Sequence, residues 1–121
     1  MESDNQVLII DDGRNIRLTL KRALNNAGYR VQTAPSGEIG LQKLREEQFS
    51  LVLLDLKLPG MNGLEVLAEM GGLEYSTEVI AMTAYDNNED EKKARHLGAV
   101  EFIYKPFDCR EILSLTKKHM E

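Results

Sequence analysis

Short apolar runs alternate with longer amphipathic stretches along the whole chain. After Gln6, the run at 6–10 is continuous in Val, Leu and Ile, as is the run at 51–54, which is typical of strands covered on both faces of a parallel sheet. Weaker runs at 29–34, 78–83 and 99–104 predict three further strands. The pattern therefore predicts five strands, with the first and third fully buried.

Each predicted strand is followed by a stretch whose apolar residues recur at helical spacing. In the first stretch, after Gly13, Leu18 lies opposite the apolar stripe and is expected to face solvent, and Gly28 is expected to end the helix. Ser36 is a candidate N-cap for the second helix, whose apolar residues begin with Ile39. The third is expected from Gly63 to the Gly71-Gly72 pair, the fourth over 87–97, and the last from a capping box at 108–111 to about Lys118.

Strict alternation of strand and helix with short connections implies right-handed crossovers and a parallel sheet covered on both faces. The fold class we expect is α/β, with five helices and a doubly wound five-stranded sheet of order 2-1-3-4-5. The length of 121 residues suits one domain, 1–121, with an ordered core over about 5–118.

Composition narrows the function classes. The apolar content of 42% and charged content of 29% are those of a globular protein, and the net charge of −5 argues against a nucleic-acid-binding surface. No apolar run approaches a membrane span, and the acidic, polar N-terminus is unlike a secretory signal, so we expect a cytoplasmic protein that binds no membrane. The one cysteine, Cys109, excludes an internal disulfide, and His96 and His119 stand in no motif and are expected at the surface.

The carboxyl ends of the predicted strands carry the candidate chemistry. Asp11 and Asp12 end the first strand, Asp55 the third and Thr83 the fourth, while Lys105 follows the fifth. Because parallel strands end at one edge of the sheet, these side chains are expected to converge there. Each alone could be a cap or a solvated side chain, but their joint occurrence at one edge favours a site.

Three clustered carboxylates repel one another unless a cation neutralises them, and hard oxygen ligands favour Mg²⁺, with Mn²⁺ as the alternative. A lysine and a hydroxyl at the same place would complete a site for a tetrahedral oxyanion. In this interpretation Asp55 is the nucleophile that accepts a phosphoryl group, and Lys105 and Thr83 stabilise the developing charge.

These residues carry a family resemblance. The Asp11-Asp12 pair, Asp55 in the segment 53–63, the triplet at 82–84 and Lys105-Pro106-Phe107 resemble the receiver domain of two-component response regulators, which has a flavodoxin-like, CheY-like fold. The resemblance implies that Asp55 takes its phosphoryl group from a histidine kinase or a histidine phosphotransfer protein.

The resemblance also implies a role for each site residue. Asp12 and Asp55 would ligate Mg²⁺ directly, Asp11 largely through water, and Lys57 through its backbone carbonyl. Thr83 and Lys105 would contact the phosphoryl oxygens, and the Lys105-Pro106 peptide would be cis.

Switching and partner surfaces follow from the same resemblance. Phe102 stands where the family carries an aromatic switch residue, which would turn inward when Thr83 moves toward the phosphoryl group. Ordinary packing in the core would also explain an aromatic residue at this position. Arg14 and Leu18 on the first helix would contact the phosphodonor. The face of the fourth helix, fifth strand and fifth helix would serve dimerisation or a downstream protein. The chain ends in the last helix, so it is expected to be either a stand-alone receiver or part of a longer regulator.

Competing functions fit less well. A haloacid-dehalogenase-like phosphatase needs a second acid two residues after the nucleophile, where this chain has Lys57. A flavin site would place a phosphate against the acidic 11–14 loop, and no Gly-rich P-loop is present. A protein-interaction module of the same fold that is never phosphorylated stays open. We therefore expect a phosphoacceptor signalling domain and no enzyme.

Overall fold

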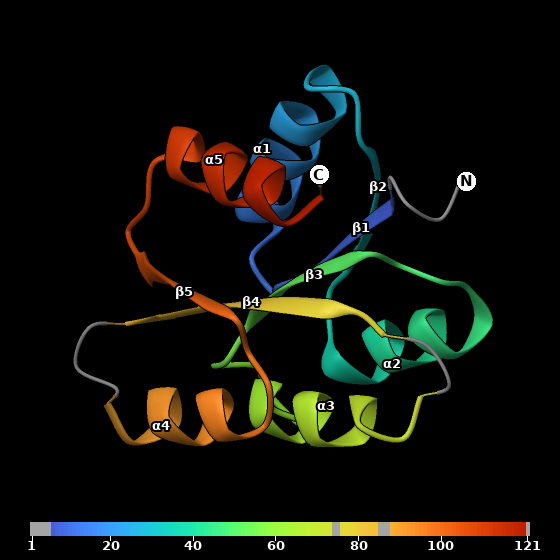
Figure 1. Ribbon diagram of the computed structural model, residues 1–121, viewed down its shortest axis with the longest axis vertical. Coiled ribbons are helices and arrows are strands. Elements are labelled where there is room, and N and C mark those ends of the chain that lie inside the picture. The colour runs from blue at the N-terminus through green and yellow to red at the C-terminus, as the bar shows by residue number, and fades with distance from the viewer. Residues whose placement is uncertain (1–5, 74–75, 85–87, 121) are drawn as a thin grey trace.

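One parallel sheet organises the molecule (Figure 1). The computed structural model describes residues 6–73, 76–84 and 88–120. The strand order is β2-β1-β3-β4-β5, as the sequence predicted, and all neighbouring pairs are parallel. The strands are β1 (Gln6–Ile10), β2 (Arg30–Ala34), β3 (Leu51–Asp55), β4 (Glu78–Ala84) and β5 (Glu101–Lys105).

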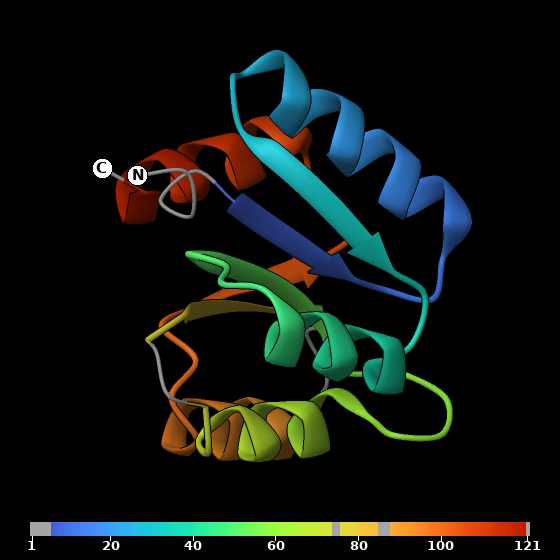
Figure 2. The ribbon, with the colours of Figure 1, turned by 90° about the vertical axis from the view of Figure 1, so that its right-hand side faces the viewer.

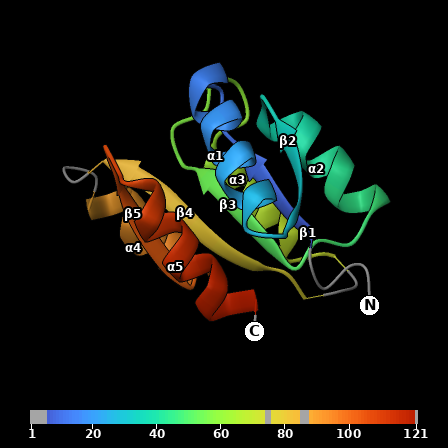
Figure 3. The same cartoon turned by 90° about the horizontal axis from the view of Figure 1, so that it is seen from above.

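Helices cover both faces of this sheet, so the fold is doubly wound (Figures 1 and 2). One face carries α1 and α5, which contact each other and lie over the strands in the view from above (Figure 3). The opposite face carries the other three helices in a row. The helices are α1 (Arg14–Asn26), α2 (Gly37–Glu46), α3 (Gly63–Met70), α4 (Asn88–His96) and α5 (Cys109–Met120).

The two faces of the sheet divide the core into two hydrophobic clusters. Along β1, Val7 and Ile9 pack under α1 and α5, while Leu8 and Ile10 pack under α2 and α3. All residues of β1 and β3 are buried, which explains their continuous apolar runs. Full burial of such a side chain contributes about 1.5–3 kcal/mol relative to exposure. The central strands, whose carboxyl ends form one edge of the sheet, are therefore packed firmly on both faces.

Helix ends agree with most of the sequence signals. The Ser36 side chain accepts a hydrogen bond from the Ile39 amide at 3.2 Å, so the predicted N-cap of α2 is confirmed. Gly28 follows α1 with φ of +101°, a left-handed conformation that costs glycine little. The start of α3 holds a capping box between Asn62 and Glu65 that the sequence analysis missed, although the Asn-x-x-Glu spacing signals it.

The boundaries of several strands and helices differ from the sequence predictions, for the strands by one or two residues. β5 begins at Glu101 because the Ala99 amide donates to the Ala94 carbonyl and so closes the end of α4. β2 begins one residue late, at Arg30, because the Tyr29 amide donates to the Leu24 carbonyl of α1. α4 ends at His96 and α5 extends to Met120. Residue 87, the predicted start of α4, lies outside the described residues.

Three side-chain predictions were wrong. His119 is not a surface residue: its side chain is 14% exposed, with Nδ1 3.1 Å from Glu78 Oε1 and Nε2 2.9 Å from Glu101 Oε2. Ile39, counted with the apolar stripe of α2, is 41% exposed, and the neighbouring Gly40 lies against Ile10 of β1 instead. Asp108 accepts from the Arg110 amide, one residue earlier than in a capping box.

Two other surface predictions are confirmed. Leu18 is 50% exposed, and His96 is exposed. Within the described ranges, no helix is both long and apolar enough to span a membrane.

Candidate functional site

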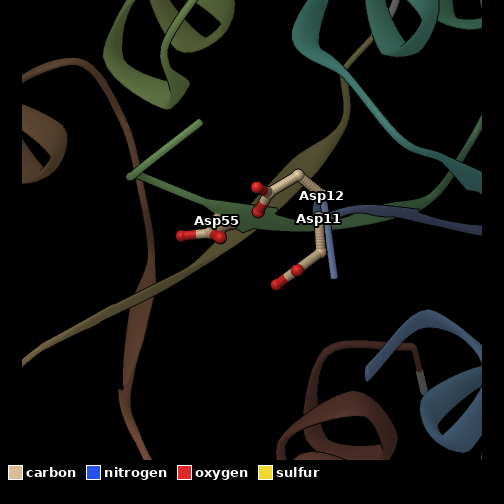
Figure 4. Close-up of side chains that lie close together, drawn as sticks. All are labelled: Asp11, Asp12 and Asp55. Carbon is tan, nitrogen blue, oxygen red and sulfur yellow. The ribbon is translucent and has the colours of Figure 1, made fainter. Parts of the chain in front are cut away.

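Three carboxylates meet at the carboxyl edge of the sheet, as the strand ends predicted (Figure 4). One oxygen from each of Asp11, Asp12 and Asp55 lies within 4.8 Å of the others. Asp11 and Asp55 are buried, with 1% and 3% of their surface exposed, whereas Asp12 is exposed. A buried acidic pair is costly unless a cation balances it.

Strand pairing explains why these acids meet. Ile10 of β1 lies beside Leu54 of β3, so the residues that follow them, Asp11 and Asp55, leave the sheet side by side. The Asp11 amide still pairs with the Ala34 carbonyl of β2 at 3.2 Å. The buried apolar runs thus determine the pairing register of β1 and β3, and this register determines where the two acids lie.

Lys105, the last residue of β5, supplies the balancing charge. Its Nζ donates to Asp11 Oδ2 at 2.9 Å and to Asp55 Oδ2 at 3.0 Å. Burial alone would lower the pKa of Lys105, but the hydrogen bonds and charges of the two carboxylates outweigh it and raise that pKa above its ordinary value. The ammonium therefore stays charged between the two acids.

The pKa of Asp55 lies above its ordinary value because the carboxyl group is buried. The Lys57 amide, which donates to Asp55 Oδ1 at 2.9 Å, and the Lys105 ammonium oppose this rise, and the Asp11 charge adds to it. A poorly solvated carboxylate oriented by two donors is a suitable oxygen nucleophile.

Backbone contacts fix the acids further. The Gly13 amide donates to Asp11 Oδ1 at 2.8 Å. Gly63 lies against the chain at Asp55, where a Cβ atom would sit 2.4 Å from the Asp55 carbonyl oxygen. Only glycine allows the start of α3 to approach the end of β3 this closely.

Thr83 of β4 brings a buried hydroxyl to the same edge. It follows Met82, the neighbour of Asp55 in the sheet. In the described part of the chain, Thr83 Oγ1 and Thr116 Oγ1 are the buried side-chain atoms without a hydrogen-bond partner. Because an unpaired buried hydroxyl is unfavourable, the Thr83 hydroxyl is available to a ligand at this edge.

The aromatic position predicted to act in switching lies outside the deep core. Phe102 is half-buried, packs against the cluster under α2 to α4, and has the Arg95 guanidinium 4.6 Å above its ring centroid. Tyr104, on the same face of β5, donates to the carboxylate of Glu91. The cis Lys105-Pro106 peptide that the resemblance implied is present.

The donor set fits a hard divalent cation. Three carboxylates at one edge offer oxygen ligands, and one of them, Asp12, reaches solvent and can receive an ion that keeps several waters. Lys105 alone does not balance three negative charges. Asp11, Asp12 and Asp55 could therefore hold Mg²⁺, whereas a ligand role for the Lys57 carbonyl remains a prediction.

Sequence reasoning missed one side chain at the site. Arg17 of α1 donates from Nη1 to the Asp11 carbonyl oxygen at 2.8 Å. Its partner is a backbone atom, so no pattern of charged residues signals the contact. The predicted docking residues Arg14 and Leu18 are both exposed on the same helix.

Comparison with known proteins identifies the family. The model of the response regulator receiver domain matches residues 7–117. This chain belongs to that family. Sporulation initiation phosphotransferase F of Bacillus subtilis is 38% identical over 117 residues, which cover 97% of this chain and 94% of that protein. The CheY-like receiver domain protein of Methanospirillum hungatei superposes with a TM-score of 0.91 at 34% identity, covering 96% of this chain and 93% of that one.

In longer relatives the match covers only part of the protein. Response regulator ArlR of Staphylococcus aureus is 36% identical over 109 residues, which are 90% of this chain but 49% of ArlR. The receiver is therefore the part shared by all three proteins, and the fold and the family predicted from the sequence are confirmed.

Proposed function

We propose that Asp55 accepts a phosphoryl group from a phosphohistidine and that this transfer requires Mg²⁺. The observation that carries the proposal is the buried Asp11–Asp55 pair sharing one lysine at an acidic edge. The unpaired Thr83 hydroxyl at that edge adds support, since it offers a donor to an incoming oxyanion.

The transfer uses this chain's groups in defined roles. An Asp55 carboxylate oxygen attacks phosphorus, and the phosphorus–nitrogen bond to the donor histidine breaks, leaving its electron pair on nitrogen. The Lys105 ammonium and the Thr83 hydroxyl then bind phosphoryl oxygens. Mg²⁺, or Mn²⁺, held by Asp11, Asp12 and Asp55 with the Lys57 carbonyl, would supply the positive charge that neutralises the phosphoryl oxygens.

The chemical consequence is a signal rather than turnover of a substrate. We regard the chain as a phosphoacceptor that catalyses only its own phosphorylation and dephosphorylation, and not as a classical enzyme. Movement of Thr83 toward the phosphoryl group would leave space into which the Phe102 side chain would turn. This rearrangement would change the surface formed by α4, β5 and α5. That surface would control a downstream protein, a second copy or an attached output domain.

Partners on the donor side would be a histidine kinase or a histidine phosphotransfer protein, contacting Arg14 and Leu18 on α1. Leu18 is half exposed on α1. Leu18→Ala is therefore expected to slow transfer from a cognate histidine donor about tenfold and to leave labelling by a small phosphodonor unchanged. Equal slowing with both donors would contradict docking.

A phosphorelay step is a second candidate for the output. It is favoured by the match over 94% of a relative whose name is that of a phosphotransferase. Transfer of label from this chain to a histidine phosphotransfer protein would separate a relay from control of a binding partner.

The decisive experiment mixes the protein with Mg²⁺ and phosphoramidate and follows its intact mass. We expect the mass of one phosphoryl group to be added and to be lost in base, as for an acyl phosphate. Asp55→Asn should take none, and chelation of the metal should prevent labelling. Labelling of Asp55→Asn would place the phosphoryl group elsewhere and contradict the proposal, whereas no labelling of the wild type would leave the unphosphorylated interaction module as the better description.

Two further predictions belong to this proposal. Residues 1–121 would form a single receiver domain, supported by the match over 7–117 and by the one sheet. A cytoplasmic location remains a prediction, and a dehalogenase-like phosphatase stays disfavoured because Lys57 occupies the position of its second acid.

A further inference from the structure

The three acids at the sheet edge are not held equally. Asp55 accepts from the Lys57 amide and from Lys105, and Asp11 accepts from the Gly13 amide and from Lys105. Asp12 is exposed, and its carboxylate accepts no hydrogen bond from any described residue. The direction in which Asp12 points therefore depends on its backbone.

That backbone is attached to α1 through Arg17. The Asp11 carbonyl lies beyond the last residue of β1, and Arg17 Nη1 donates to it at 2.8 Å. Because the peptide group is planar, fixing this carbonyl also fixes the amide nitrogen and Cα of Asp12. The Arg17 side chain therefore acts on the one acid that lacks its own support.

The attachment is short and rigid. The Arg17 amide donates to the Gly13 carbonyl at 3.0 Å, so the residue that holds the Asp11 carbonyl also belongs to the first turn of α1. The Arg17 side chain is half-buried, and a planar guanidinium loses little freedom when it forms such a bond. Strand end, loop and helix start thus form one closed unit.

We infer that Arg17 is a positioning residue that holds Asp12 in the direction needed to bind the metal. The inference rests on the proposed function, because it assigns a role in the same site. Groups that orient metal ligands typically contribute about 10–100-fold to metal affinity.

The test is isothermal titration of Mg²⁺ into the wild type and Arg17→Gln. We expect the dissociation constant of Arg17→Gln to rise about tenfold. Arg22→Gln is the matched control, since it removes the same charge from an exposed position of the same helix, and its Mg²⁺ affinity should not change. Equal affinity of Arg17→Gln and wild type would overturn the inference.

Arg17→Lys separates position from charge. Lysine keeps the positive charge but lacks the planar fork, so its Mg²⁺ affinity should also fall severalfold. Loss of the positive charge would by itself raise Mg²⁺ affinity, so charge alone cannot explain reduced affinity in Arg17→Gln. Full affinity in Arg17→Lys together with full affinity in Arg17→Gln would overturn a positioning role. Because both variants keep a long polar side chain, at least one should fold, which circular dichroism without metal would check.

Kinetics give a second readout. If Arg17 only orients Asp12, the Mg²⁺ concentration for half-maximal phosphorylation of Arg17→Gln by phosphoramidate should rise by the same factor as the dissociation constant. The rate at saturating Mg²⁺ should then approach that of the wild type. A rate that stays low at saturating Mg²⁺ in a folded variant would contradict positioning.

Asp12→Asn distinguishes failure of the inference from failure of the proposed function. If Asp12→Asn binds Mg²⁺ as well as the wild type, the acidic edge is not the metal site and the proposed function fails. If Asp12→Asn loses affinity and Arg17→Gln does not, only the inference about Arg17 fails.

Discussion

Among the side chains described, the Lys105 ammonium is the only positive group hydrogen-bonded to the carboxylates of the three acids, and it contacts just two of them. The edge therefore retains excess negative charge, and part of it lies in the buried Asp55 carboxylate. Such an arrangement favours ligand binding over stability. The repulsion between the clustered carboxylates is offset only when cations or hydrogen-bond donors bind to them.

The raised pKa of Asp55 predicts how stability depends on pH in the metal-free protein. Since the folded state holds this proton more tightly than the unfolded chain, the carboxyl group loses its stabilising contribution as pH rises from its ordinary pKa of 3.8 through the folded value. Asp55→Asn should therefore raise the free energy of unfolding near neutral pH.

This gain should shrink toward acid and vanish below the ordinary carboxyl pKa, where both proteins carry a neutral group. Urea denaturation at several pH values, with a chelator present, measures the difference. A gain that is constant with pH, or a loss of stability at neutral pH, would contradict the raised pKa.

The unpaired hydroxyl of Thr83 allows a sharper comparison, because the buried Thr116 hydroxyl of α5 also lacks a partner. Replacement by valine removes an unsatisfied buried oxygen at nearly constant volume, so both Thr83→Val and Thr116→Val should preserve stability or raise it by up to about 1 kcal/mol.

Only Thr83→Val should slow phosphorylation by phosphoramidate, about tenfold or more, because only that hydroxyl lies at the acidic edge. Rates measured by intact mass, alongside denaturation curves, check both effects. Equal rates in the two variants would remove Thr83 from the site.

Two contacts join α4 to β5 at the scale of secondary-structure elements. Arg95 covers the ring of Phe102, and Tyr104 donates to Glu91. If Phe102 moves inward when Thr83 binds the phosphoryl group, the Arg95–Phe102 contact must break. A cation over an aromatic ring contributes about 0.5–1 kcal/mol at an exposed site.

Arg95→Ala should therefore favour the switched arrangement and speed phosphorylation by phosphoramidate about two- to fivefold. Hydrogen exchange of the β5 amides should also become faster in the unphosphorylated variant. Lys92→Ala is the control, because Lys92 belongs to the side of α4 near Leu64. If Lys92→Ala has the same effect, loss of charge explains the change and the contact does not.

Strands and helices could be predicted from the sequence where the burial of their own side chains produces a clear apolar pattern. The runs of β1 and β3 are buried on both sides and could not be mistaken, and the strand ends that followed from them located Asp11 and Asp55. Contacts between distant elements were not predictable. The burial of His119 depends on two glutamates at the starts of β4 and β5, and the role of Arg17 depends on a backbone carbonyl.

Metal binding should be visible in the stability of the whole molecule. A ligand that binds only the folded state stabilises it by RT ln(1 + [L]/Kd), or about 1.4 kcal/mol at ten times Kd. For a domain of this size the melting temperature should rise by about 4–7 °C. Scanning calorimetry with Mg²⁺ and with a chelator measures the rise, which Asp12→Asn should lack. An equal rise in Asp12→Asn would place the ion elsewhere.

The close approach of Gly63 to the Asp55 carbonyl has a consequence for how sequences of this fold can diverge. Any side chain at Gly63 would push the phosphoacceptor strand away from α3, since the nearest atoms are backbone and cannot rotate aside. The neighbouring position, Asn62, tolerates more substitutions, because Asp, Ser or Thr would also accept a hydrogen bond from the Glu65 amide. In a saturation mutagenesis library selected for signalling, adjacent positions should therefore differ sharply, with a single permitted residue at 63 and several at 62.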